Sequence, residues 1–373
     1  MTKMSVFSLI IFLLIISLIY LGMHYFVYWR IASGYDLPVE YRRIIKFAFL
    51  IAALTYFLAR IFGKSFLAIP LGHIGAVWMG IISIALSVFI VQMIAAWVFP
   101  RQVGLFTAIA IILVVLVSVF SMCNASRDPR VRRVEIPIAK LPPELSGFTV
   151  VMLADLHLER WKSAEWLNSV VDKTNRMYPD LIVIIGDLID EDIRKNQGFF
   201  DALKRLDSRY GVIAVTGNHE FYAGIDVFTE LCKSLKIKIL RNSSITIADA
   251  IEVVGIDEDT GKRFGGVGAD LEKAMEDCDV AKPTILLSHQ PLYFDDAVSR
   301  GVDLQLSGHT HAGQIPPMDL ITLLYFKYPY GLYQKGSSFI YTTCGTGTWA
   351  PPMRLFSRSE IVKIVLQSAD IGR

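Results

Sequence analysis

The stretch Ser307-Gly308-His309-Thr310-His311 decides how this sequence folds and what it binds. It follows an apolar run and places two histidines one residue apart. Residues at positions i and i+2 of an extended chain point to the same side, so both imidazoles can reach one bound ion. Taken alone, a His-x-His pattern is a weak signal, because a lone histidine is more often a hydrogen-bonded core residue.

Four further polar clusters lie upstream, each after a short run rich in Val, Ile and Leu. They are Asp155-Leu156-His157, Gly186-Asp187, Gly217-Asn218-His219-Glu220 and Ser288-His289. The apolar runs alternate with amphipathic stretches such as 163–177, which predicts a layered α/β domain. Ligands of such domains bind beyond the carboxyl ends of the strands, so we expect the clusters to meet at one site.

The residue types in these clusters indicate a metal centre with two ions. Mixed Asp, Asn and His ligation suits manganese, iron or zinc better than magnesium or calcium. The clusters contain no cysteine, which argues against a structural zinc site. A carboxylate such as Asp187 has two oxygens and can bridge two cations, which then clamp the attacking and leaving oxygens of a displacement. Asp190, by contrast, is expected to be only a turn or cap residue.

Together the clusters resemble the calcineurin-like metallophosphoesterase superfamily, in its membrane-associated bacterial branch. The resemblance rests on Asp155-x-His157, Gly186-Asp187, Gly217-Asn218-His219-Glu220, His289 and Gly308-His309-Thr310-His311. It covers nearly all of 134–366 and implies a four-layer αββα sandwich with the activity of a metal-dependent phosphoric ester hydrolase, of the phosphodiesterase or pyrophosphatase type. One departure is visible: Ala154 stands where the family often has Ser.

Carried over to this sequence, the resemblance implies two divalent metal ions, manganese in the first place and iron or zinc as the alternatives. The first metal would be held by Asp155, His157, Asp187 and His311. The second would be held by Asp187, Asn218, His289 and His309. His219 would be the catalytic proton donor at the leaving oxygen, and a metal-bridging hydroxide the nucleophile. Arg354 is a candidate substrate-binding residue that clamps a phosphate oxygen, or else a structural ion-pair partner.

The first third of the chain is far more apolar than the rest. Hydrophobic residues make up 53% of the chain and the mean hydropathy is +0.45. Four apolar stretches, at 5–29, 44–61, 71–98 and 105–122, are near or above the roughly 20 residues that cross a bilayer. We therefore predict an all-α transmembrane region of four helices at 1–123, a basic linker at 124–133 and a catalytic domain at 134–373.

These spans predict a multi-pass protein of the cell (inner) membrane, with the lipid bilayer as its partner. Counts of Lys and Arg near the span ends slightly favour a cytoplasmic catalytic domain. The four cysteines leave an odd number in the soluble part, which does not suggest a disulfide framework. We expect no nucleic-acid partner, and the sequence does not predict an oligomeric state.

The substrate is predicted to be a phosphoester, and a lipid-linked one in particular. The segment 315–335 is unusually apolar and begins just after the site histidines, so we expect it to form a lip that dips into the headgroup layer. Ordinary domain packing of this segment is the alternative. Two other functions stay open: a tethered phosphodiesterase or phosphatase with a soluble substrate such as a cyclic nucleotide, and a non-catalytic metal-binding sensor or scaffold.

Overall fold

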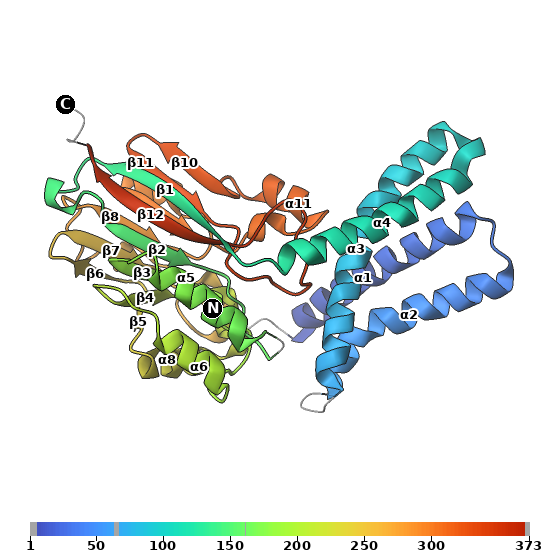
Figure 1. Cartoon of the computed structure of the whole chain (residues 1–373), viewed down its shortest axis with the longest axis horizontal. Coiled ribbons are helices and arrows are strands. Elements are labelled where there is room, and N and C mark those ends of the chain that lie inside the picture. Colours follow the sequence, from blue (N-terminus) through green and yellow to red (C-terminus); the bar gives the residue numbers. More distant parts are fainter. Residues whose placement is uncertain (1–5, 63–66, 161, 370–373) are drawn as a thin grey trace.

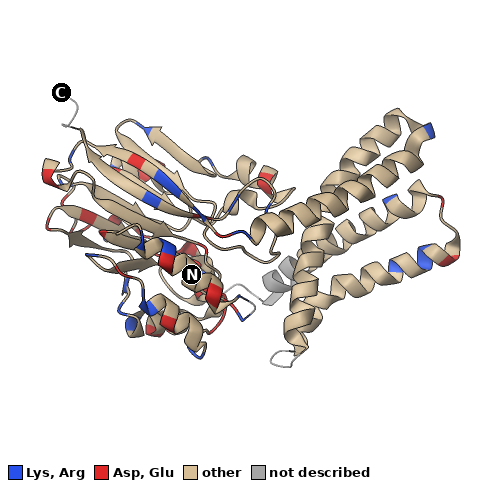
Figure 2. Ribbon diagram, in the orientation of Figure 1, with Lys and Arg blue, Asp and Glu red and all other residues tan. Residues whose placement is uncertain are grey.

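The computed structural model describes residues 6–62, 67–160 and 162–369, and has a helical part beside a two-sheet domain (Figure 1). The helical part consists of α1 (Val6–Gly34), α2 (Val39–Phe62), α3 (Ala68–Val98) and α4 (Val103–Ala125). Three stretches are long and apolar enough to cross a membrane: Leu14–Gly34, Ala68–Val98 and Pro100–Ala125. Charged residues are sparse on these helices and frequent on the two-sheet domain (Figure 2).

The prediction of four apolar spans is thus confirmed for three of the helices. The described part of α2 contains Arg42, Arg43 and Lys46 near its start, which makes it less apolar than the others. It still packs against α3, where Phe49 lies edge-on to Trp78. Ser5, where the first predicted span begins, lies outside the described residues.

The first sheet of the larger domain carries the strands that follow the membrane region. Its order is β1-β12-β2-β3-β4-β5. The bounds are β1 (Arg130–Ile138), β2 (Thr149–Leu153), β3 (Leu181–Ile185), β4 (Val212–Val215), β5 (Lys238–Ile239) and β12 (Glu360–Ser368). Every residue of β2 and β3 is buried, because both faces of these central strands are covered.

The second sheet has the order β10-β11-β9-β8-β7-β6. Its strands are β6 (Ser243–Ile247), β7 (Ile251–Gly255), β8 (Thr284–Leu287), β9 (Leu304–Ser307), β10 (Gly331–Lys335) and β11 (Ser338–Thr342). Apolar side chains of both sheets form one core between them. The strands β2, β3 and β4 are parallel to one another, as are β7, β8 and β9, so each sheet collects carboxyl ends at one edge.

Helices cover the outer faces of both sheets. The first sheet packs against α5 (Ala164–Asn175), α6 (Gln197–Lys204) and α8 (Ile225–Ser234). The second packs against α9 (Leu271–Ala274) and α10 (Phe294–Ser299). These layers confirm the predicted four-layer αββα sandwich. The short α7 (Asn218–Ala223) and α11 (Met318–Tyr325) lie outside the layers.

The predicted linker is shorter than expected. Its last residues, from Arg130, belong to β1, which pairs with β12 in parallel. This pairing joins residues about 230 positions apart, such as Arg130 and Glu360. No local pattern in the sequence predicts it.

The two-sheet domain is docked onto the helices as well as tethered to them. In α4, Asn124 Nδ2 donates to the main-chain oxygens of Arg354 at 3.0 Å and Ser357 at 2.9 Å. In α3, Ser83 Oγ donates to Pro316 O at 2.7 Å. Beside these bonds Ile84, Ile315 and Met353 form a small apolar core. The loops that carry the site therefore rest directly on α3 and α4.

Candidate metal centre

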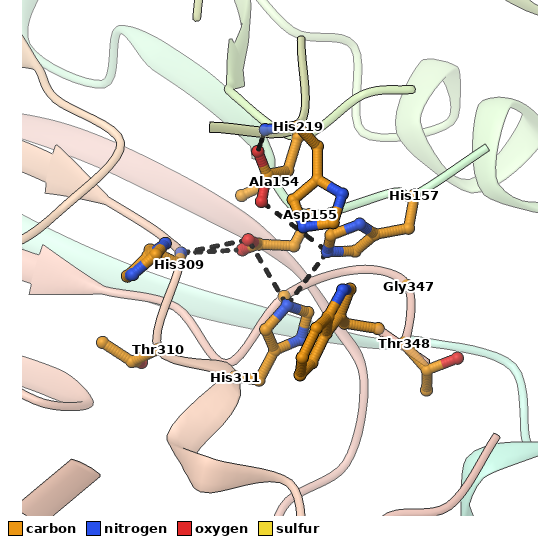
Figure 3. Close-up of polar contacts among 12 residues, drawn as sticks. Ala154, Asp155, His157, His219, His309, Thr310, His311, Gly347 and Thr348 are labelled. Atoms are coloured by element: carbon orange, nitrogen blue, oxygen red, sulfur yellow. Dashed lines mark hydrogen bonds and ion pairs between the residues drawn. The ribbon is translucent and has the colours of Figure 1, made fainter. Parts of the chain in front are cut away.

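The side chains predicted as metal ligands come from the carboxyl ends of strands in both sheets. In chain order these are Asp155 and His157 after β2, Asp187 after β3, Asn218 after β4, His289 after β8, and His309 and His311 after β9. Most are buried; only Asn218 and His309 are partly exposed. Asp155 and its histidine neighbours face a common point (Figure 3). The structure therefore brings the predicted ligands together.

Two histidine pairs mark two places for an ion. His157 Nε2 lies 3.1 Å from His311 Nε2, and His309 Nδ1 lies 3.1 Å from His289 Nε2. Asp187 stands between the pairs, with Oδ2 3.2 Å from His289 Nε2 and 3.8 Å from His157 Nε2. Three groups of side chains hold their ligand atoms within 4.8 Å of one another. These are Asp155 with His157 and His311, His157 with Asp187 and His219, and Asp187 with His289 and His309.

The chemistry of this donor set fits divalent cations. The facing atoms carry lone pairs or negative charge, and such atoms repel one another unless a proton or a cation lies among them. Asn218 Oδ1 is buried and has no hydrogen-bond partner, so one further acceptor is left without a donor. Imidazole nitrogens and carboxylate oxygens are the ligands that manganese, iron and zinc accept together.

Hydrogen bonds to Nδ1 orient the imidazole rings of His289 and His157 as metal ligands. His289 Nδ1 lies 2.9 Å from the main-chain oxygen of Ile185, and His157 Nδ1 lies 2.7 Å from Asp190 Oδ1. An oxygen at that distance requires the proton on Nδ1, which leaves Nε2 free as a metal ligand. Such outer partners fix the tautomer and the orientation of metal-binding histidines.

The backbone at the centre is strained. Five of the predicted ligands have a positive φ: Asp155 at 53°, His157 at 49°, Asp187 at 50°, His309 at 69° and His311 at 49°. Non-glycine residues rarely adopt this left-handed conformation, which persists where surrounding structure enforces it and clusters at functional sites. These conformations occur directly after strands β2, β3 and β9, where the predicted ligands lie.

Comparison with known proteins places the chain in a family. The model of the calcineurin-like phosphoesterases matches residues 148–313, which include every predicted ligand. An uncharacterized metallophosphoesterase from Campylobacter jejuni is 30% identical over 381 residues, covering 96% of this chain and 98% of that protein. The chain belongs to the calcineurin-like phosphoesterase family. The resemblance found in the sequence is confirmed.

Some relatives with a metallophosphoesterase domain are named as transmembrane proteins. A Danio rerio protein named transmembrane protein with metallophosphoesterase domain is 37% identical over 275 residues. The match covers 70% of this chain and 63% of that relative, so the chain spans just under two thirds of its length. Among solved structures, a dimetal phosphatase from Danio rerio is 16% identical, covers 53% of this chain and 87% of that one, and superimposes with a TM-score of 0.35.

Within this calcineurin-like site, Asp190 does more than the sequence suggested. Its Oδ1 accepts from His157 Nδ1 at 2.7 Å and lies 2.9 Å from His219 Nδ1. Burial lowers the pKa of His219, but the hydrogen bond to Asp190 and the charge of Asp187 outweigh it and raise this pKa to about 9. The prediction of a mere turn or cap residue is wrong, because one carboxylate orients a predicted ligand and the predicted proton donor.

Glu220 is a second residue whose role the sequence did not reveal. Its carboxylate is fully buried and accepts four main-chain N–H groups. The donors are Asp187 at 2.9 Å, Leu188 at 2.7 Å, Ile189 at 3.2 Å and Gly217 at 2.6 Å. Glu220 therefore ties the loop after β3 to the loop after β4 and holds Asp187 in place. Only its position beside His219 in the motif could have drawn attention to it.

Arg354 is fully buried and faces the protein rather than the cavity. Its Nη2 donates to the main-chain oxygens of Cys344 at 2.7 Å and Gly347 at 2.6 Å. Its Nη1 donates to Ser357 Oγ at 2.9 Å and His311 O at 3.3 Å. These contacts favour a role in holding the loops around His311 over the predicted phosphate clamp, and they include no carboxylate of an ion pair.

A cavity of about 500 Å³ opens from the site. At one end it is lined by His157, Asp187, Asn218, His219, His309 and His311. At the other end it is lined by side chains of the membrane helices α1 and α3 and of α11. Its size lies within the range of about 300–1,000 Å³ that is usual for small-molecule sites.

Proposed function

We propose that this protein is a membrane-anchored, metal-dependent phosphoester hydrolase. The observation that carries the proposal is the convergence of two histidine pairs, with Asp187 between them, at the mouth of a cavity. Family membership supports the same reaction class. The finer proposal is that it cleaves a phosphodiester or pyrophosphate bond.

We assign the ligands to two ions that share Asp187. One ion would be held by Asp155, His157, Asp187 and His311, and the other by Asp187, Asn218, His289 and His309. The donor set supports manganese, with iron or zinc as alternatives. When bound, two such ions supply charge for the phosphoryl oxygens and lower the pKa of water.

The protein's own contribution begins with proton supply. His219 lines the cavity and is held through Nδ1 by Asp190. This fixes the proton on Nδ1 and turns Nε2 to the substrate, where the charged ring can protonate a leaving oxygen. Trp349 packs edge-on to His219 with ring centroids 6.2 Å apart and covers one side of the ring.

The membrane side of the cavity supports a lipid-linked substrate over a soluble one. A cyclic nucleotide or another soluble ester gains little from an apolar wall made by membrane helices, whereas such a wall can bind the hydrocarbon chain of a lipid phosphoester. The exposed apolar face of α11 supports the same choice. It displays Leu320, Ile321, Leu323, Leu324 and Tyr325, each 48% or more exposed. Such a face fits the headgroup layer of a bilayer.

We place the protein in the cell (inner) membrane with the catalytic domain in the cytoplasm. The apolar helices and the relatives named transmembrane support a membrane protein. The side rests on the distribution of Lys and Arg near the ends of the spans.

The test is hydrolysis by the purified full-length protein with added manganese. Bis-p-nitrophenyl phosphate reports on diesters and p-nitrophenyl phosphate on monoesters. We expect diester cleavage that His219→Ala reduces by about 100-fold or more, in line with the contribution of a general acid. Asp187→Ala should reduce it at least as much, because it would remove a ligand of both ions. Absence of cleavage from a protein that binds two metals would refute the proposal and favour a sensor or scaffold.

A further inference from the structure

We propose that the transmembrane helices α1 and α3 form part of the substrate site and bind the hydrocarbon chain of a lipid phosphoester. The phosphate of this lipid would lie at the metal centre. The inference rests on the proposed function and assigns the lipid tail to particular residues of the membrane region.

One face of α1 lines the cavity. The residues are Ile16, Ile19, Tyr20 and Met23, at positions i, i+3, i+4 and i+7 of the helix. This spacing places them in a single stripe. The opposite residues of α1, such as Leu18, are exposed but do not line the cavity. The stripe is therefore a specific wall and not a general property of an apolar helix.

Residues of α3 and α11 also line the cavity at helical spacing. Met79, Ile82 and Ser83 of α3 follow the i, i+3, i+4 pattern, and Met318 and Thr322 of α11 are four residues apart. Phe326, which follows α11, also lines the cavity and stacks edge-on to His309 with ring centroids 5.8 Å apart. The same cavity is thus lined by the membrane helices at one end and, through Phe326, borders a predicted metal ligand at the other.

Most polar side chains of this wall are already engaged in hydrogen bonds within the protein. Tyr20 donates to Ala53 O at 3.2 Å and Ser83 to Pro316 O at 2.7 Å. Gln314 Nε2 donates to the oxygens of Trp349 and Pro351, both at 2.9 Å. Among the described residues that line the cavity, those with charge belong to the metal centre. A sugar or a base would find few free partners here, whereas an alkyl chain requires none.

The cavity is open where a lipid would enter. Ile19 is 60% exposed on α1 and Met318 is 44% exposed on α11, and both line the cavity. Ile19 lies within the apolar helix α1, in the stretch long enough to cross a membrane, so this opening faces the bilayer. A lipid can reach the site sideways from the bilayer without leaving it.

The first test compares two diesters that differ only in chain length, ethyl and octyl p-nitrophenyl phosphate. The full-length protein is reconstituted in nanodiscs, and kcat/KM is measured for both esters. Each methylene bound by an apolar wall contributes about fourfold. We expect Ile19→Trp and Met79→Trp to lower the octyl-to-ethyl ratio by about tenfold or more, while the ethyl rate stays within about twofold.

The control is Leu18→Trp, which adds the same side chain to the adjacent, 72% exposed position outside the cavity. It should leave the ratio unchanged. An unchanged ratio in both cavity variants would overturn the inference while ethyl hydrolysis still supported the proposed function. A loss of both ester activities in the cavity variants alone would also overturn it, because a tail site affects only the longer ester.

The second test does not depend on hydrolysis. An alkyl phosphonate with sixteen carbons and a mid-chain diazirine is photoactivated in the same nanodiscs, with and without excess hexadecyl phosphonate. We expect competed labelling in peptides that contain 16–23 and 79–83, reduced several-fold by Ile19→Trp and unaffected by Leu18→Trp. Competed labelling that is absent from α1 and α3 would refute the tail site even if the protein hydrolyses no ester.

Discussion

Replacing Glu220 with glutamine tests how the loops of the metal centre are held. The carboxylate accepts four main-chain N–H groups, two on each oxygen. In Glu220→Gln one oxygen keeps two of these bonds, and the new NH₂ group faces the other two donors. Each buried donor left without an acceptor costs about 1–3 kcal/mol, so the change should reduce the free energy of unfolding by about 2–6 kcal/mol.

This loss is large beside the 5–15 kcal/mol that stabilises a typical domain. It corresponds to a fall in Tm on the order of 10 °C for a domain of this size. Thermal unfolding of the full-length protein in detergent, followed by intrinsic fluorescence, measures it. The exposed Glu144 supplies the matched control, and Glu144→Gln should unfold like the wild type. If Glu220→Gln unfolds within about 2 °C of both, the four bonds do not hold the loops.

Three further substitutions probe the same account. Asp190→Asn should weaken metal binding by about 10–100-fold, because the carboxylate orients both His157 and His219, and calorimetric titration with manganese checks this against Asp192→Asn. Gly217→Ala should displace Asp187, whose Oδ1 would lie 2.2 Å from the new methyl group, and lower metal content; Gly22→Ala, which meets nothing within 4 Å, should not. Asn124→Ala leaves two carbonyls of the docking loop without donors. It should lower the Tm by several degrees, and a Tm equal to the wild type would contradict the docking of the domain on α4.

The metal centre could be predicted from local sequence patterns, each an apolar run followed by a short polar motif. Asp155, Asp187 and His309 each follow a short apolar run, and both the run and the motif lie within a few residues. The parallel order of the strands then brings their ends together, as expected for this class of fold. The four-layer sandwich could be predicted because these same local motifs carry the family resemblance.

Features that depend on distant contacts were missed. Asp190 joins His157 and His219 from a loop about 30 residues from each, and Glu220 reaches back to the loop that carries Asp187. Arg354 looked like a substrate residue because sequence does not reveal burial, and the pairing of β1 with β12 spans most of the domain. The membrane wall of the cavity arises only when α3 docks against the loops after β9, with α1 packed against α3.

The most direct measurement is the metal content of the full-length protein purified in the presence of manganese, determined by mass spectrometry of the metal per chain. We expect about two ions per chain in the wild type, and one or fewer in Asp187→Ala, because Asp187 would be a ligand of both ions. Fewer than one ion per chain in the wild type, or two ions retained in Asp187→Ala, would contradict the shared two-metal centre.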